Sequence, residues 1–189
     1  REFEERVAIT PDIVKKYKSL GLETHLSKNY ASHLGINDQE YKFQGAIIVE
    51  KDDDVIVNSN ALLQMNIPND ATLSKLKNDQ ILVGVLNPYS NKKKLTQIIS
   101  KNVKCFSLEL LPRITRAQSM DILSSQANLA GYKAVLDSFA YFQKAIPMMM
   151  TAAGTISAAK VLVVGAGVAG LHAIATAKRM GAIVFATDV

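Results

Sequence analysis

The stretch that decides the fold reads Lys160-Val-Leu-Val-Val-Gly165-Ala-Gly167-Val-Ala-Gly170. Its apolar run at residues 161–164 has no polar break, which predicts a parallel strand buried on both faces. The glycines follow this strand directly, and an apolar helical pattern then extends to Met180. A second apolar strand is predicted at residues 183–187, with Asp188 immediately after it. This order of elements predicts a βαβ unit of a parallel sheet.

The spacing Gly-x-Gly-x-x-Gly has a physical use at such a turn. Gly165 allows the tight change of direction, Gly167 leaves the backbone open to a pyrophosphate, and Gly170 lets the helix lie close to the strand. Asp188 lies 23 residues after Gly165, where an acid that binds a ribose hydroxyl is expected. A glycine-rich turn without a ligand is the alternative, but the ordered elements favour a dinucleotide site. The carboxylate also favours NAD(H) over NADP(H), because a 2′-phosphate would meet a like charge there.

Length and composition limit the class of protein. The 189 residues are 48% hydrophobic, enough for one or two domains, and the net charge of +5 is scattered. The cluster Lys92-Lys93-Lys94 predicts a solvated helix start, not a nucleic-acid site. The acidic run Asp52-Asp53-Asp54 predicts a turn before a strand, and because it lacks the spacing of a metal loop, no metal site is expected. Cys105 is the only cysteine, so no internal disulfide can form, and no apolar run approaches the ~20 residues of a membrane span.

The first half of the chain alternates between predicted helices and strands. Thr10-Pro11-Asp12 is a strong helix start, and Gly21 ends that helix. Further helices are predicted at 30–34, 38–44, 72–76 and 93–100, and strands at 22–26, 47–49, 55–57, 81–86 and 103–109. The alternation favours a parallel α/β sheet. We interpret His25 and His33 as structural or surface residues.

The segment from Glu109 to Asp121 places several polar side chains after a predicted strand, where functional groups of parallel sheets gather. A long helix is predicted at 125–145, ended by Pro147. Spacing alone favours a structural interpretation, in which Thr115-x-x-Gln118 is a capping box and Asp121 forms a surface pair with Arg113.

The expected architecture is α/β, with two Rossmann-like domains built on parallel sheets, the second truncated. Residues 1–124 are expected to form an N-terminal α/β domain, 125–145 a connecting helix, and 146–189 the start of a dinucleotide-binding domain. The chain has no initiator methionine, and its last residue, Val189, directly follows the second strand of the glycine-turn unit. We therefore expect a fragment of a longer protein.

Three stretches resemble one known family. The segment from Glu109 to Tyr132, and residues 147–188, resemble the alpha subunit of proton-translocating NAD(P) transhydrogenases. The motif Arg6-Val-Ala-Ile-Thr-Pro11 resembles both that subunit and alanine dehydrogenase. The resemblance covers nearly the whole chain and is most specific from Glu109 to Gly131.

The resemblance implies a peripheral, dimeric NAD(H)-binding component on the cytoplasmic face of the inner membrane. Its implied partners are a membrane-spanning domain and an NADP(H)-binding beta subunit. Hydride would pass directly between the two nicotinamides, coupled to proton translocation. Nothing in this scheme requires a metal or a nucleic acid.

The resemblance also assigns roles to single residues. Carried over by motif, Arg113, Gln118, Asp121 and Ser124 lie around the nicotinamide and its ribose, and the first three of these form the catalytic set. Gln118 would bridge toward the partner's nucleotide, which replaces the capping interpretation. The pyrophosphate and adenosine side is assigned to Gly165, Gly167, Val168 and Gly170, with Asp188 on the adenosine ribose.

Two alternative functions stay open. An alanine dehydrogenase would need a lysine and a histidine, which by its pattern fall at about Asn60, after the strand predicted at 55–57, and at about Asn87. Neither asparagine can act as a general acid or base at neutral pH, and Arg6 alone cannot perform amine chemistry. A non-catalytic NAD(H)-binding module would need the glycine turn and Asp188, but not the polar segment.

Overall fold

The computed structural model describes residues 4–189, and the chain divides into two compact units, Arg1–Leu111 and Pro112–Val189. The division into domains predicted from the sequence, at residues 124 and 145, stays a prediction.

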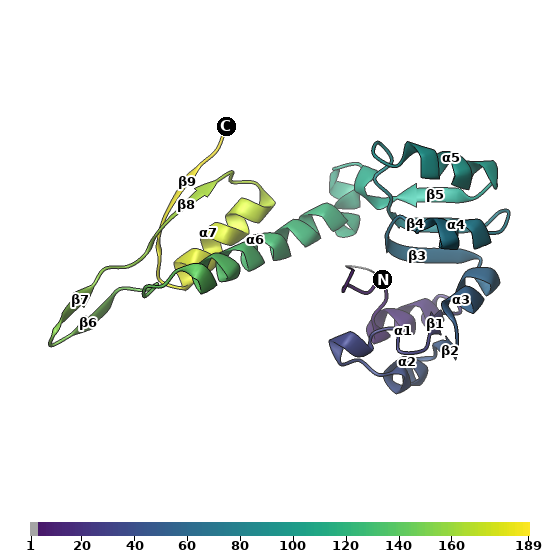
Figure 1. Cartoon of the computed structure of the whole chain (residues 1–189), viewed down its shortest axis with the longest axis horizontal. Helices are drawn as coiled ribbons and strands as arrows, with labels where there is room; N and C mark the ends of the chain where they lie inside the picture. The colour runs from purple at the N-terminus through teal and green to yellow at the C-terminus, as the bar shows by residue number, and fades with distance from the viewer. Residues whose placement is uncertain (1–3) are drawn as a thin grey trace. The chain divides into compact units, whose positions relative to one another are not determined.

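The first unit is a mixed α/β structure with two parallel sheets (Figure 1). Strands β1 (His25–Ser27) and β2 (Ile47–Val49) pair in parallel, as do β3 (Ala61–Asn66), β4 (Ile81–Val85) and β5 (Lys104–Ser107). The helices between them are α1 (Pro11–Ser19), η1 (Ser32–Leu34), α2 (Asp38–Gln44), α3 (Asp52–Asn58), α4 (Asp70–Lys75) and α5 (Lys92–Ser100), and η2 (Leu108–Leu110) follows β5. The expected α/β class with parallel sheets is confirmed.

Two hydrophobic cores hold the first unit together. One lies around β3, β4 and β5, where Leu82 and Ile98 are buried on the central strand and on α5. The other lies around β1 and α2, with Tyr41 at its centre. The Tyr41 hydroxyl donates a hydrogen bond to the Ile9 carbonyl at 2.9 Å, so this buried polar group is satisfied.

One predicted strand of the first unit is wrong. Residues 55–57 lie within helix α3, and Asp52-Asp53-Asp54 form its first turn rather than a turn before a strand. Three carboxylates at this position are stabilised by the positive end of the helix dipole. A three-residue β-branched run cannot by itself distinguish a strand from a buried helix face, and here only Ile56 is buried. The strand follows later, as β3, which was not predicted.

Other boundaries shift by a few residues. The strand predicted at 22–26 begins at His25, and the strand predicted at 103–109 ends at Ser107, where η2 takes over. Lys92 begins α5, as the solvated helix start at the lysine cluster predicted.

The second unit contains a long helix packed along a shorter one (Figure 1). It runs through η3 (Thr115–Met120), α6 (Ile122–Tyr141), a hairpin of β6 (Met149–Thr151) and β7 (Gly154–Ile156), then β8 (Lys160–Val164), α7 (Val168–Arg179) and β9 (Ile183–Thr187). The β8–α7–β9 unit agrees with its sequence prediction, and β8 and β9 pair in parallel. The long helix begins three residues earlier than predicted, and the hairpin was not anticipated.

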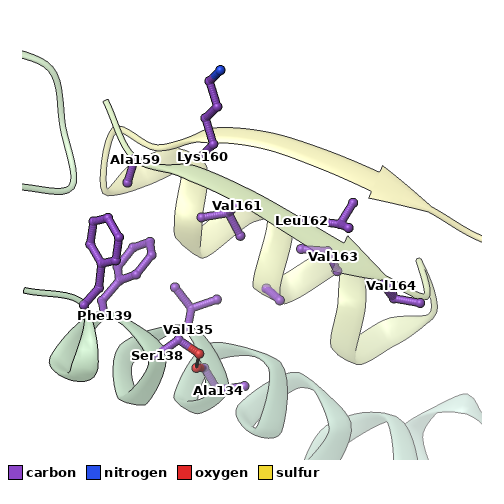
Figure 2. Close-up of a pocket in the computed structure, with 12 residues that line it drawn as sticks. Ala134, Val135, Ser138, Phe139, Ala159, Lys160, Val161, Leu162, Val163 and Val164 are labelled. Carbon is purple, nitrogen blue, oxygen red and sulfur yellow. Dashed lines mark hydrogen bonds between the residues drawn. The ribbon is translucent and has the colours of Figure 1, made fainter. Parts of the chain in front are cut away.

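The burial expected for β8 is also wrong. The strand alternates, with Val161 and Val163 half-buried on the side of the helices, as Figure 2 shows. Leu162 and Val164 are 67% and 80% exposed on the other side. Helices cover one face of the two-stranded sheet, so the continuous apolar run is only half used for packing within this unit.

Adjacent isoleucines on α5 test the core of the first unit. Ile98 is 1% exposed and Ile99 is 65% exposed, although both lie on the same helix. We expect Ile98→Ala to lower the free energy of unfolding by about 3 kcal/mol, because it leaves a cavity. The matched control Ile99→Ala should change it by less than ~0.5 kcal/mol. Urea denaturation followed by circular dichroism measures both, and equal losses would contradict the assigned core.

Candidate dinucleotide-binding site

The glycine turn between β8 and α7 has the backbone form that the motif predicts. Gly165 adopts a φ of +99°, which a residue with a side chain rarely adopts. A Cβ built on Gly170 would lie 1.8 Å from the Gly165 carbonyl oxygen, so only glycine fits the helix start. A Cβ on Gly167 would meet nothing within 4 Å, so the space beside this backbone is open. These three positions fit the cradle of a pyrophosphate at a helix N-terminus.

Asp188 lies beside this turn. Parallel pairing sets Val164 opposite Thr187, and the Gly165 N–H donates to the Thr187 carbonyl at 2.8 Å. The Asp188 carboxylate accepts the Ala166 N–H at 2.8 Å and the Val189 N–H at 2.9 Å. These hydrogen bonds, that from Ala166 first, lower the pKa of Asp188, so the group is a carboxylate at neutral pH. A carboxylate has further lone pairs for a ribose hydroxyl.

The start of α6 brings together two of the residues predicted for the nicotinamide end. Asp121 caps the helix, accepting the Ser124 N–H at 2.9 Å and the Ser124 hydroxyl at 2.6 Å. Both bonds lower the pKa of Asp121, and the positive charge of Arg113 adds to the effect. Arg113 and Gln118 are themselves exposed. The structure therefore groups Asp121, Ser124 and Arg113, and leaves Gln118 on the solvent side of η3.

The capping box predicted for the start of the long helix is wrong. Thr115 is the first residue of η3, whose N-cap is Ile114, and no side chain caps that element. Asp121 takes the capping role because its carboxylate reaches both groups of Ser124, three residues along.

Two residues of the site were not recognised from the sequence as structural partners. A Cβ on Gly131, in the middle of α6, would lie 2.0 Å from the Ala169 carbonyl oxygen in the first turn of α7. The two helices therefore touch through their backbones. The signal was present as a glycine inside a helical pattern, which is costly unless packing requires it.

In the first unit, Glu109 holds the end of β4. Its carboxylate accepts the N–H groups of Leu86 and Asn87 at 3.3 and 2.5 Å. Asn87 has a φ of +45°, and Asn91 donates to the carbonyls of Leu86 and Asn87 at 3.0 and 3.3 Å. The turn that follows β4 is thus fixed from both sides. From the sequence, Glu109 was recognised only as a member of a polar segment.

The position proposed for an alanine dehydrogenase lysine needs correction. Asn60 was chosen because it follows a strand predicted at 55–57, which is helix α3. The strand in this region ends at Asn66, whose amide donates to Glu4 at 2.7 Å. Glu4 also pairs with Arg6 at 2.7 Å, which is the main reason that the pKa of Glu4 falls to about 2. An asparagine again stands where a lysine would be needed.

The second unit also contains an apolar hollow of about 440 Å³ between α6 and β8 (Figure 2). Val135 and Phe139 line it from the helix, and Val161 and Val163 from the strand. The hydroxyl of Ser138 donates to the Ala134 carbonyl at 2.7 Å. The hollow offers mainly apolar contacts, and we do not assign the cofactor to it.

The described residues, 4–189, contain no group of three or more His, Cys, Asp or Glu side chains arranged to bind a metal. Of the two histidines that we interpreted as structural, His25 contacts Glu23, and His33 contacts the Glu5 carbonyl oxygen at 2.7 Å. Over the same residues, no helix is both long and apolar enough to cross a bilayer.

Comparison with known proteins gives consistent matches over the whole chain. The family model "Alanine dehydrogenase/PNT, N-terminal domain" matches residues 1–130, and "Alanine dehydrogenase/PNT, C-terminal domain" matches residues 134–189. In Rhodospirillum rubrum, the first polypeptide of a divided NAD(P) transhydrogenase subunit alpha is 43% identical over 194 residues, covering 100% of this chain and 50% of that protein.

Solved structures agree. The crystal structure of transhydrogenase from Sinorhizobium meliloti has a TM-score of 0.94 at 45% identity, covering 98% of this chain and 55% of that one. An L-alanine dehydrogenase, at 20% identity and a TM-score of 0.81 over 95% of this chain and 50% of that one, shares the fold. The chain spans about half the length of the curated relatives that it matches.

The Asp121 cap can be tested by titration. We expect Ser124→Ala to raise the pKa of Asp121 toward its ordinary value, because the shorter of its two hydrogen bonds is lost. A lowered folded-state pKa means that the cap stabilises the fold above the unfolded-state pKa, and that this is lost as pH falls through the folded-state pKa. Carboxyl ¹³C NMR measures the shift. The neighbouring Ser125→Ala is the control, and an equal rise there would refute the assignment.

Proposed function

Because the chain belongs to the alanine dehydrogenase/PNT family, we propose that it is the NAD(H)-binding component of a proton-translocating NAD(P) transhydrogenase. The observation that carries the proposal is the meeting of Asp188 with the glycine turn, in a chain 43–45% identical to transhydrogenases along its length. Family membership supports an enzyme component that binds NAD(H); the finer assignments below belong to the proposal.

The chain's own residues fit a dinucleotide at this turn. The open space beside Gly167 admits a pyrophosphate against the backbone, and the N-terminus of α7, at Val168, faces it with a positive dipole end. Asp188 receives a ribose hydroxyl and disfavours a 2′-phosphate, which selects NAD(H). When bound, the nicotinamide supplies the hydride.

Hydride transfer requires position more than acid or base chemistry. Two rings must be held about 3–3.5 Å apart with water excluded. Arg113, Asp121 and Ser124 supply charge and hydrogen bonds that orient one ring and its ribose, and the Asp121–Ser124 pair is itself fixed as a helix cap. Gln118 is exposed and is proposed to reach the partner's nucleotide.

The partners follow from the relatives. Similar curated proteins are named as an NAD(P) transhydrogenase subunit alpha or a portion of one, which indicates that those proteins act with other subunits. We propose that this chain docks on a membrane-spanning domain, faces an NADP(H)-binding beta subunit, and dimerises on the cytoplasmic face of the inner membrane. Proton coupling is then assigned to the partners.

A self-contained alanine dehydrogenase fits less well. Asn87 and Asn66 stand after the two strands that would carry its histidine and lysine, and neither side chain transfers a proton at neutral pH. A non-catalytic NAD(H)-binding module leaves the Arg113–Ser124 cluster unexplained.

Transfer between subunits tests the proposed roles. The natural polypeptide that carries residues 1–189 is mixed with an NADP(H)-binding partner domain, and reduction of a bound NADP analogue by NADH is followed optically. We expect Gln118→Ala and Asp121→Ala to slow transfer by about tenfold to a hundredfold, because misplacement of the rings by ~1 Å has that cost. Arg116→Ala, an exposed change in the same element η3, is the control. Full-rate transfer in both site variants would refute their roles.

Binding by the 189-residue chain is a separate test. Here β8 and β9 form a sheet of only two strands, with Leu162 and Phe185 exposed. We expect residues 1–189 alone to bind NADH more weakly than the natural polypeptide, because some of the pocket would come from further strands. Titration of NADH fluorescence compares the two forms, and equal affinity would contradict this expectation.

A further inference from the structure

We propose that Gly131 is a positioning residue, which sets the separation between the nicotinamide end and the pyrophosphate end of the dinucleotide site. The inference rests on the proposed function, because it takes those two ends to bind one NAD(H) molecule. It concerns the second unit alone.

The contact is between backbones. Gly131 is buried in the interior of the 20-residue helix α6. A Cβ built there would lie 2.0 Å from the carbonyl oxygen of Ala169, 2.8 Å from its carbonyl carbon and 3.1 Å from its Cα. None of these atoms can move by a change of rotamer. A helix-interior glycine is destabilising by about 1 kcal/mol relative to alanine, so the close approach is what it provides.

Both ends of the proposed site lie within a short distance of this contact along rigid elements. Ser124 precedes Gly131 by seven residues on the same helix, roughly 10 Å at 1.5 Å per residue. Gly167 precedes Ala169 by two residues, at the N-cap of α7. The meeting of Gly131 with Ala169 therefore relates the Asp121–Ser124 cap to the glycine turn.

Packing farther along α6 is looser. The apolar hollow begins at Ala134 and Val135 and continues past Phe139, so this stretch of the helix stands away from β8 (Figure 2). A displacement of α6 can be absorbed there, but not at Gly131. Adding a methyl group at Gly131 must push the two backbones apart by about 1 Å or more to reach an ordinary carbon contact.

The two ends can be probed by ligands of different length. NADH spans both ends, whereas ADP reaches only the glycine turn and Asp188. In the natural polypeptide, we expect Gly131→Ala to raise the Kd of NADH about tenfold while the Kd of ADP changes less than about twofold, because only the longer ligand senses the altered separation. Isothermal titration calorimetry measures both constants.

The ratio of the two constants separates positioning from stability. Loss of folded protein weakens both ligands by the same factor, so the ratio of the Kd of NADH to that of ADP is unaffected by destabilisation. Val135→Ala, one helical turn along α6, is the matched control. It should lower the melting temperature through a cavity and leave the ratio at the wild-type value.

A milder pair of variants serves if Gly131→Ala does not fold. Ala130 and Ala134 are exposed alanines on either side of Gly131. Ala130→Gly loosens α6 between the site and the contact and should raise the ratio about twofold, whereas Ala134→Gly, with the same loss of helix propensity, should not change it.

The outcomes distinguish the two proposals. Failure of the wild-type polypeptide to bind either ligand would overturn the proposed function. Wild-type binding of both ligands, with an unchanged ratio in Gly131→Ala, or in Ala130→Gly where the first variant is unfolded, would overturn the positioning role and leave the function intact.

Discussion

The second unit depends on a place where two backbones come too close for any side chain. At the β8–α7 junction the Gly165 carbonyl occupies the space that a Cβ of Gly170 would need, so the helix can begin directly against the strand that precedes it. Because α7 starts there, it returns the chain to form β9 in parallel with β8, with Val164 opposite Thr187. That register places the Asp188 carboxylate on the Ala166 N–H and keeps the acid ionised beside the turn. One steric constraint thus produces the fold, the charge and the open backbone of the candidate site.

Much of this could be predicted from residues that leave one conformation available. The βαβ unit and the central strand at Ile81–Val85 were found because long apolar runs and glycines act together. The helix at residues 52–58 was missed because its short β-branched run is compatible with either element, and tertiary packing of Ile56 decides. The exposure of Leu162 could not be foreseen, since an apolar run specifies what a strand can bury rather than what a unit covers.

The candidate site shows the same division. Gly165, Gly170 and Asp188 have roles dictated by backbone geometry, and the structure brings them together. The Arg113–Ser124 segment does not follow from spacing, because Thr115-x-x-Gln118 and Asp121-x-x-Ser124 both offer a helix cap, and only the second is used. Its assignment to the nicotinamide came from resemblance to a family. Gly131 was visible in the sequence, but its partner Ala169 lies 38 residues away, beyond any local pattern.

The Glu109 clamp in the first unit reads the main chain at residue 87 and ignores its side chain. The left-handed φ of +45° at that position is one that asparagine, aspartate and histidine tolerate better than most residues. An asparagine and a histidine can therefore exchange there with the turn left intact. Divergence within a common scaffold could thus add or remove a proton-transferring group by a single codon change, so that related enzymes with different chemistries inherit the same architecture.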